Sequence, residues 1–201
     1  MLSGQKIVLA VTGSIAAYKS CELLRLLIKR GAEVSVIMTE AAQRFVTPLS
    51  FQALGAKKVY TGDWGDSASP IPHIEATKDA SLLLVAPATA NILAKAAQGL
   101  ADDLLSAAIL AARCPVAYAP AMNTFMWHNQ ATQRNVTQLT QDGAIFLGPD
   151  SGEQACGDIG SGRMLEPEDI IELLQGAFSP RLLDRCRVLI TAGPTLDLRA
   201  D

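Results

Sequence analysis

The N-terminal part of the chain alternates short apolar runs with a segment of helical spacing. Residues 6–12 (KIVLAVT) are almost wholly apolar and end at Gly13, which is typical of a buried parallel strand. Residues 34–38 form a second run of this kind. Residues 15–30 lie between the two runs and have helical spacing, with Gly31 placed to end the helix. One face of this helix carries Ala17, Cys21, Leu24, Leu27 and Ile28. The pattern predicts a β-α-β unit, which is almost always right-handed with parallel strands.

The alternation continues along the chain. Further strands are predicted at residues 81–86, 116–119 and 144–147. Helices are predicted at residues 39–45 (stopped by Pro48), 91–98, 102–112, 127–141 and 168–174 (ended by Gly176). Glycine and proline predict mostly loop at residues 55–72 and a mobile loop at residues 148–163. The predicted fold is a doubly wound α/β domain, Rossmann-like and flavodoxin-like, with helices on both faces of a parallel sheet.

Composition excludes several classes of protein. The chain has 201 residues, of which 49% are hydrophobic and 18% charged, so it has enough apolar residues for a core and is not disordered as a whole. With 17 basic and 20 acidic residues and no basic run, no nucleic-acid partner is expected. No long uncharged apolar stretch or secretory signal pattern is present, so we expect a cytoplasmic protein without a membrane partner. Four cysteines lie far apart and form no CxxC pair, so no metal is expected.

Polar residues follow two of the predicted strands. Gly13 and Ser14 lie where a strand leads into a helix, and the free N–H groups of such a turn attract phosphate. A plain strand–helix turn explains them equally well. Thr89 lies in a similar turn after residues 81–86, where it is either a ligand-binding residue or only a helix cap. The absence of GxGxxG spacing disfavours an ordinary nicotinamide dehydrogenase.

Three further residues are candidates for chemistry. His73 is one of two histidines, and a lone histidine is more often structural than catalytic. Asn123 directly follows the strand at residues 116–119, where its amide can donate to an anionic group. Cys156 lies with Arg163 in a glycine-rich segment; its thiol is either an acid near neutral pH or an exposed incidental group.

These signals coincide, in order over residues 5–178, with one family. The segments are GSIAAYK at residues 13–19, His73, APATAN at residues 86–91, PAMN with a following MW at residues 120–127, and ACGDxGxGRM at residues 155–164. Together they resemble the phosphopantothenoylcysteine decarboxylases, which are homo-oligomeric flavin-containing cysteine decarboxylases. The last two segments are the most specific, because neither is a general nucleotide motif.

The resemblance implies an FMN-dependent decarboxylation of 4′-phosphopantothenoylcysteine to 4′-phosphopantetheine, in coenzyme A biosynthesis. The implied route oxidises the substrate thiol to a thioaldehyde, releases CO2 and reduces the resulting enethiolate again. The implied catalytic residues are His73, Asn123 and Cys156, with Cys156 as proton donor. The implied FMN-binding residues are Gly13, Ser14, Ile15, Thr39, Pro87, Thr89, Ala90, Ser106 and Met122. The implied substrate-binding residues are Asn123, Ala155, Cys156, Arg163 and Met164.

The same resemblance implies a homo-oligomer, a trimer or dodecamer, with the flavin site between protomers. It also implies that the segment 152–164 closes over the substrate. It divides the chain into a decarboxylase domain at residues 1–180 and, at residues 181–201, a linker with the truncated start of a synthetase domain. The tail at residues 190–195 (ITAGPT) resembles that start, whereas residues 196–201 depart from it.

Other functions stay open on the sequence alone. A related flavoprotein could decarboxylate a peptide, and a non-catalytic homologue could bind flavin and regulate phosphatases. A flavin prenyltransferase is disfavoured by the complete PAMNxxMW and ACGDxGxGRM segments. The presence of His73, Asn123 and Cys156 together favours catalysis.

Overall fold

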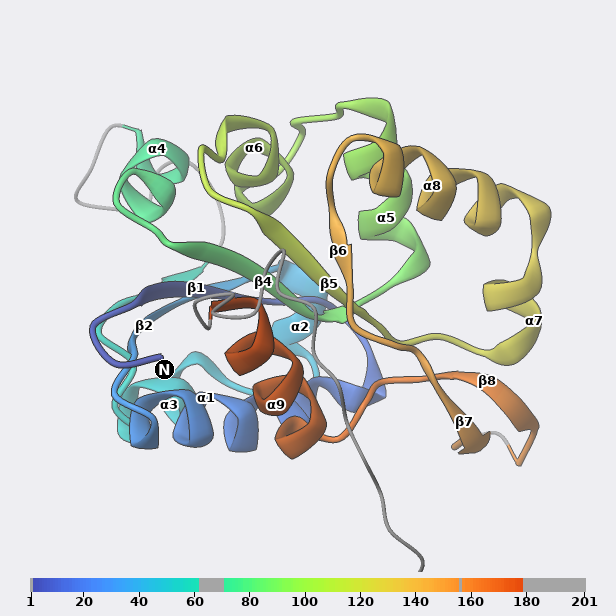
Figure 1. Ribbon diagram of the computed structural model, residues 1–201, viewed down its shortest axis with the longest axis horizontal. Coiled ribbons are helices and arrows are strands. Elements are labelled where there is room, and N and C mark those ends of the chain that lie inside the picture. The colour runs from blue at the N-terminus through green and yellow to red at the C-terminus, as the bar shows by residue number, and fades with distance from the viewer. Residues whose placement is uncertain (1, 62–70, 156, 179–201) are drawn as a thin grey trace, which may run out of the picture.

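The computed structural model describes residues 2–61, 71–155 and 157–178. Its main feature is a six-stranded parallel sheet in the order β3-β2-β1-β4-β5-β6 (Figure 1). The strands are β1 (Lys6–Val11), β2 (Glu33–Met38), β3 (Val59–Thr61), β4 (Leu82–Ala88), β5 (Val116–Pro120) and β6 (Ile145–Phe146). This is the strand order of a Rossmann fold, and it confirms the predicted doubly wound α/β class. The order reverses between β1 and β4, where such folds bind ligands.

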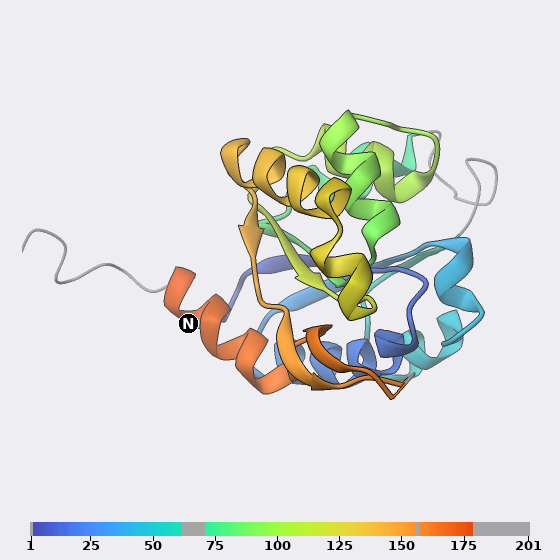
Figure 2. The ribbon, with the colours of Figure 1, turned by 90° about the vertical axis from the view of Figure 1, so that its right-hand side faces the viewer.

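Helices cover both faces of the sheet (Figures 1 and 2). One face carries α1 (Lys19–Lys29), which follows the short 3-10 helix η1 (Ile15–Tyr18), together with α3 (Pro48–Ala53) and α9 (Pro167–Phe178). The other face carries α4 (Pro72–Thr77), α5 (Ala90–Gln98), α6 (Leu104–Ala111) and α8 (Gln130–Gln141). Two short helices, α2 (Glu40–Gln43) and α7 (Thr124–His128), follow β2 and β5 at the carboxyl edge of the sheet.

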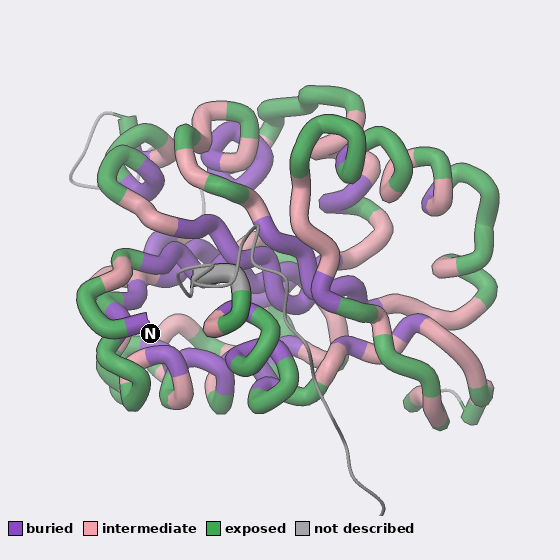
Figure 3. Tube along the Cα trace, in the orientation of Figure 1, coloured by how far each residue is buried: buried purple, intermediate pink, exposed green. Residues whose placement is uncertain are grey.

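The apolar strands feed two hydrophobic cores because side chains alternate between the faces of a sheet. In β1, Ile7 and Leu9 are buried in the core beneath α1 and α9, whereas Val8 and Ala10 are buried in the core beneath α5 and α6. Figure 3 shows the central strands as the most continuously buried part of the chain. Burial of each Leu or Ile side chain stabilises the fold by about 1.5–3 kcal/mol, so the central sheet holds the ends of its strands in fixed positions.

Three segments differ from the prediction for residues 40–80. Helix α2 ends at Gln43, before the predicted end at residue 45, and Pro48 begins α3 rather than stopping α2, since proline lacks an N–H that the first turn would leave unpaired anyway. Within the predicted loop at residues 55–72, residues 59–61 form the edge strand β3, while residues 62–70 lie outside the described residues. Pro72 likewise begins α4, which carries His73.

Two further corrections concern the C-terminal half. The segment 127–141 is two helices rather than one, because Asn129 has an extended backbone and caps α8. The predicted loop at residues 148–163 contains an antiparallel pair, β7 (Asp150–Glu153) and β8 (Ile159–Arg163). We call the described residues of the segment 150–163 the hairpin. The last helix runs past Gly176 to Phe178. Within the described residues, no helix is long and apolar enough to cross a membrane.

Candidate functional site

A cavity of about 630 Å³ opens at the carboxyl ends of β1, β2, β4 and β5. Its position matches the reversal of strand order between β1 and β4, where doubly wound folds bind ligands. We call it the first cavity. It is lined by residues 12–14, 38–41, 89–92, 102–105, 121–122 and by Lys95 and Met126. Of the predicted cofactor residues, it includes Gly13, Ser14, Thr39, Thr89, Ala90 and Met122.

The turn after β1 is tied to the turn after β4. The buried hydroxyl of Thr12 donates to the Pro87 carbonyl oxygen at 2.7 Å and accepts from the Thr89 N–H at 3.3 Å. Gly13 lies against α2: a Cβ at this position would be 2.5 Å from the Cβ of Ala41. Glycine is therefore required for the close approach of the two segments that form this wall.

Ser14, Thr39 and Thr89 each cap a helix and also line the first cavity. The Ser14 hydroxyl accepts from the Ala16 N–H at 3.2 Å, and the Thr39 hydroxyl accepts from the Ala42 N–H at 3.2 Å. Thr89 caps α5 by accepting from the Ile92 N–H at 3.4 Å. Thr89 is thus a helix cap, as one interpretation of the sequence held, and at the same time part of the cavity wall. Capped helix starts that converge on one cavity favour an anionic group such as phosphate.

A charged group that sequence reasoning missed forms another wall. Lys95 donates to Asp102 at 2.9 Å and to Asp103 at 2.6 Å. The Lys95 bond lowers the pKa of Asp102, and the two carboxylates raise the pKa of Lys95. Burial opposes ionisation of Asp103, yet its bonds from Lys95 and from the Ser106 N–H lower its pKa below the usual value. The signal in the sequence was the acidic pair before α6, which favours a helix start.

Ser106 is placed behind this wall. It is buried and forms a capping box with Asp103, in which each side chain accepts from the other residue's backbone N–H. It lines a separate cavity of about 310 Å³ rather than the first. Its described role is therefore to hold Asp103 and the start of α6, and direct contact with a cofactor stays a prediction. Pro87 contributes through its carbonyl bond to Thr12.

A second cavity, of about 600 Å³, adjoins the first and shares Ser14, Ala121 and Met122 with it. It is lined by residues 14–16, 18–19, 121–123, 153–155 and 162–164. This set brings together the predicted residues Ile15, Asn123, Ala155, Arg163 and Met164. The hairpin thus forms one side of the second cavity, while the turns after β1 and β5 form the other.

Asn123 lies at the start of α7 with its amide held at both ends. Its Oδ1 accepts from the Phe125 N–H at 2.8 Å, and its Nδ2 donates to the Asp158 carboxylate at 2.7 Å. The second bond links the β5–α7 turn to the hairpin beside the second cavity, which Asn123 lines. Asp158 belongs to the ACGD segment, but no sequence pattern pairs it with Asn123.

Cationic side chains at the second cavity share one acid. Lys19, only 10% exposed in its side chain, donates to Glu166 at 2.8 Å and to the Met164 carbonyl oxygen at 3.2 Å. Arg163 also pairs with Glu166, at 3.2 Å. Arg163 also lines the second cavity, but its described ion pair is with Glu166, so its contact with the substrate stays a prediction.

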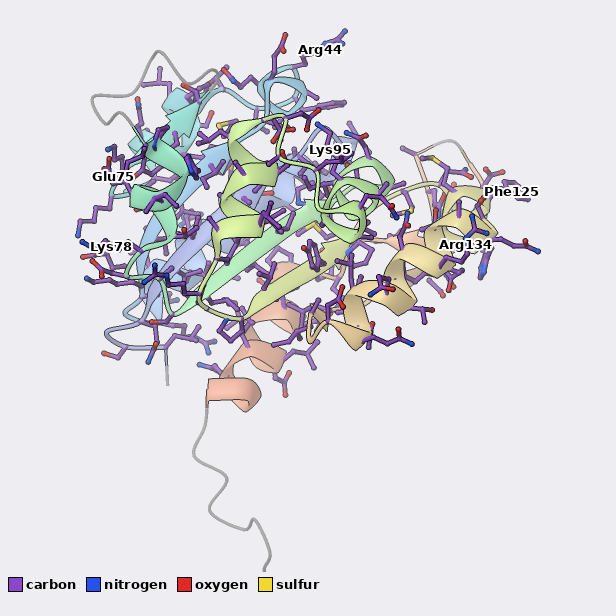
Figure 4. All side chains as sticks on the ribbon, turned by 90° about the horizontal axis from the view of Figure 1, so that it is seen from above. Arg44, Glu75, Lys78, Lys95, Phe125 and Arg134 are labelled. Atoms are coloured by element: carbon purple, nitrogen blue, oxygen red, sulfur yellow. The ribbon has the colours of Figure 1, made fainter. Side chains whose placement is uncertain are left out.

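His73 and Asn123 are not brought together within one chain. His73 lies on α4, which packs against α6 on the far side of the domain from α7. Figure 4 shows Glu75 of α4 and Phe125 of α7 at opposite ends of the molecule. Cys156 lies outside the described residues, so its role as proton donor stays a prediction. Among the residues that the structure describes, no cluster of His, Cys, Asp or Glu could hold a metal ion.

Comparison with known proteins identifies the family of this chain. A family model described as Flavoprotein matches residues 1–179. The chain belongs to the flavoprotein family. It is 50% identical over 195 residues to the "Coenzyme A biosynthesis bifunctional protein CoaBC" of Vibrio cholerae, covering 96% of this chain and 49% of that protein. The chain thus spans about half the length of the curated relatives it matches.

Two solved structures illustrate the similarity in fold. One is a PPC decarboxylase variant in complex with pantothenoylaminoethenethiol, with a TM-score of 0.77 and 34% identity, covering 86% of this chain and 97% of that one. The other is the FMN-dependent cysteine decarboxylase SpaF, with a TM-score of 0.73 and 33% identity, covering 88% of this chain and 99% of that one.

Proposed function

We propose that this chain binds FMN and decarboxylates 4′-phosphopantothenoylcysteine to 4′-phosphopantetheine, a step of coenzyme A biosynthesis. The observation that carries the proposal is the pair of adjoining cavities, which share Met122 and meet beside Asn123. One cavity can take a cofactor while the other presents a substrate to it. The similarity to CoaBC and to a solved PPC decarboxylase supports this choice of reaction.

The residues of the first cavity fit FMN. Its volume of about 630 Å³ lies within the usual range for cofactor sites. Gly13, Ser14, Thr39 and Thr89 would surround the phosphate, chiefly with the three hydroxyl groups at the helix starts, because the N–H groups of Ser14, Thr39 and Thr89 already donate within the protein. The apolar side chains of Met38, Leu105 and Met122 also line this cavity and would contact the ring system.

When bound, FMN would supply the two-electron oxidation of the substrate's CH2–SH group and the later return of those electrons. The protein's part is then to bind, orient and protonate. Asn123 would hold the substrate carboxylate, or the adjacent amide, at the second cavity. Once that carboxylate lies β to a C=S group, loss of CO2 leaves a delocalised enethiolate. The Cys156 thiol would donate the proton needed during its reduction, because a thiol is mostly protonated near neutral pH.

We further propose that a neighbouring copy supplies His73, in a trimer or dodecamer. The separation of α4 from α7 within one chain supports this, because the two catalytic residues then meet only between copies. Exposed apolar side chains near the second cavity, Phe125 at 75% and Ile159 at 80%, also favour a covered surface. The order of the oligomer and the cytoplasmic location remain predictions, as do the domain limits 1–180 and 181–201. Of these ranges, residues 179–201 lie outside the described part of the chain.

Product analysis with a substrate panel tests this function. The panel is phosphopantothenoylcysteine, pantothenoylcysteine and a peptide ending in cysteine, each incubated with the FMN-loaded protein. We expect the first to lose the mass of CO2 fastest. Preferential decarboxylation of the peptide would instead assign the chain to the peptide-modifying relatives. Bound FMN without turnover of any substrate would favour a regulatory homologue.

A further inference from the structure

The hairpin contacts three consecutive residues of the β5–α7 turn. The Met122 N–H donates to the Gly162 carbonyl oxygen at 2.9 Å. The Asn123 Nδ2 donates to Asp158 at 2.7 Å, and the Thr124 N–H donates to the Gln154 Oε1 at 3.0 Å. Contacts between α7 and β8 extend this attachment, and Figure 1 shows the two elements side by side.

Two glycines make the close approach possible. A Cβ on Gly160 would be 2.5 Å from the Thr124 Oγ1, and a Cβ on Gly162 would overlap the Met122 carbonyl oxygen. Beyond β7, the Gln154 N–H donates to the Asp158 carbonyl oxygen at 2.8 Å. The backbone therefore brings the Asp158 carboxylate to the Asn123 amide in a defined place.

The bonding partners determine which way the Asn123 amide faces. The Phe125 N–H can only donate, so the atom that faces it is Oδ1. An ionised carboxylate can only accept, so Asp158 requires Nδ2 on the other side. A flipped amide would place its oxygen against the carboxylate and its NH2 group against an N–H. Asp158 thereby excludes the reversed orientation more strongly than a neutral partner would.

We propose that Asp158 is a positioning residue, which fixes the orientation of the Asn123 amide at the second cavity when the hairpin is docked. This rests on the proposed function, since it concerns how Asn123 meets the substrate. The same bond couples two events: docking of the hairpin over the cavity and alignment of the group that receives the substrate. Without Asp158, the hairpin still has its bonds to Met122 and Thr124 and the Phe125 N–H still faces Oδ1, but the Asn123 amide loses the charged acceptor that favours Nδ2 on its other side.

The test compares substitutions in the FMN-loaded, full chain. Asp158→Ala removes the acceptor; Asp158→Asn keeps an acceptor oxygen but no charge. Asp150→Asn is the matched control, because Asp150 is an exposed hairpin carboxylate that accepts from the Ser151 N–H. Gln154→Ala is the docking comparator, because it removes the side-chain bonds to the Thr124 N–H and to the Met122 and Ser161 carbonyl oxygens and leaves the Asp158 carboxylate in place. The readouts are kcat and KM with phosphopantothenoylcysteine, and hydrogen exchange of residues 120–126.

We expect Asp158→Ala to lower kcat roughly 100-fold, the cost of a misplaced reacting group, with the flavin spectrum unchanged. Asp158→Asn should recover a large part of that loss, and Asp150→Asn should match the wild type. Exchange at residues 120–126 should rise less in Asp158→Ala than in Gln154→Ala. An active wild type with an equally active Asp158→Ala variant overturns this inference alone. The inference is also overturned if Asp158→Ala and Gln154→Ala lose kcat in the same proportion to their increase in hydrogen exchange, because Asp158 would then only help to dock the hairpin. A wild type without turnover overturns the proposed function as well.

Discussion

Replacing Gly162 by alanine should release the hairpin while leaving the rest of the fold intact. Gly162 has a backbone φ of 136°, which residues other than glycine rarely adopt. A Cβ added at this position would overlap the Met122 carbonyl oxygen. The same Cβ would come within 2.9 Å of the Gln154 Nε2. Backbone strain costs about 1–3 kcal/mol and overpacking a similar amount, so the total is about 2–6 kcal/mol.

The strain from Gly162→Ala acts on the hairpin, which is held to the rest of the domain by few hydrogen bonds. The four hydrogen bonds that attach the hairpin to Met122, Asn123 and Thr124 each contribute about 0.5–1.5 kcal/mol net, and together about 2–6 kcal/mol. The strain is thus comparable to the whole docking energy. Because residues 150–163 belong to neither hydrophobic core, we expect little change in Tm. Bound FMN should be retained, and turnover should fall at least ~10-fold, since Asn123 and the hairpin no longer meet.

Hydrogen exchange followed by mass spectrometry measures this release directly. The Gly157→Ala variant is the matched control, because Gly157 also has a positive φ, of 85°, but nothing lies within 4 Å of its added Cβ. It carries a backbone cost of about 1–2 kcal/mol without the overlap. We expect much faster exchange of residues 150–163 in Gly162→Ala than in Gly157→Ala. Equal exchange in the two variants would refute the argument from close approach.

Three further predictions concern the two cavities. Cys156→Ser should still permit oxidation and CO2 loss but slow the final reduction, so mass spectrometry should detect an accumulating enethiol; normal formation of phosphopantetheine would contradict this. Asn123→Asp should abolish turnover with flavin still bound, because it sets a second carboxylate against Asp158 and the substrate; full activity would remove Asn123 from the site. Lys95→Met should make the protein lose less stability in acid, because Lys95 helps to lower the pKa values of Asp102 and Asp103 in the folded state. The stabilisation from these lowered pKa values is present above the unfolded pKa of about 3.9 and is lost as the pH falls below that value. Thermal unfolding between pH 3 and 6 checks the last of these, and identical pH profiles for the two proteins would refute it.

Periodicity predicted the parts of the fold that bury long apolar faces. The strands at residues 6–12 and 81–86 were evident because both of their faces are covered by helices. The edge strand Val59–Thr61 escaped prediction because it is only three residues long and lies among glycines. The hairpin escaped because its polar, glycine-rich sequence has no strand pattern of its own. Its shape depends on docking against residues 122–124, a contact between segments distant in the chain.

The candidate site divides in the same way. Gly13 and Thr89 were candidates from the sequence because each follows a strand, and the carboxyl ends of parallel strands meet at one edge of the sheet, whereas Thr39 was implied only by the family resemblance; all three line the first cavity, and their contact with FMN stays a prediction. The pairing of Asn123 with Asp158 could not, since it joins two turns 35 positions apart through side chains alone. The supporting role of Ser106 likewise became visible only with its capping box to Asp103.

Removing and restoring the flavin tests the central claim most directly. The purified protein is stripped of its chromophore and then incubated with phosphopantothenoylcysteine, alone or after addition of FMN, FAD or riboflavin. We predict that FMN alone restores both the flavin absorption bands and the release of CO2, since the first cavity offers the Ser14, Thr39 and Thr89 hydroxyl groups for a single terminal phosphate. Decarboxylation at an undiminished rate by the stripped protein would contradict the account.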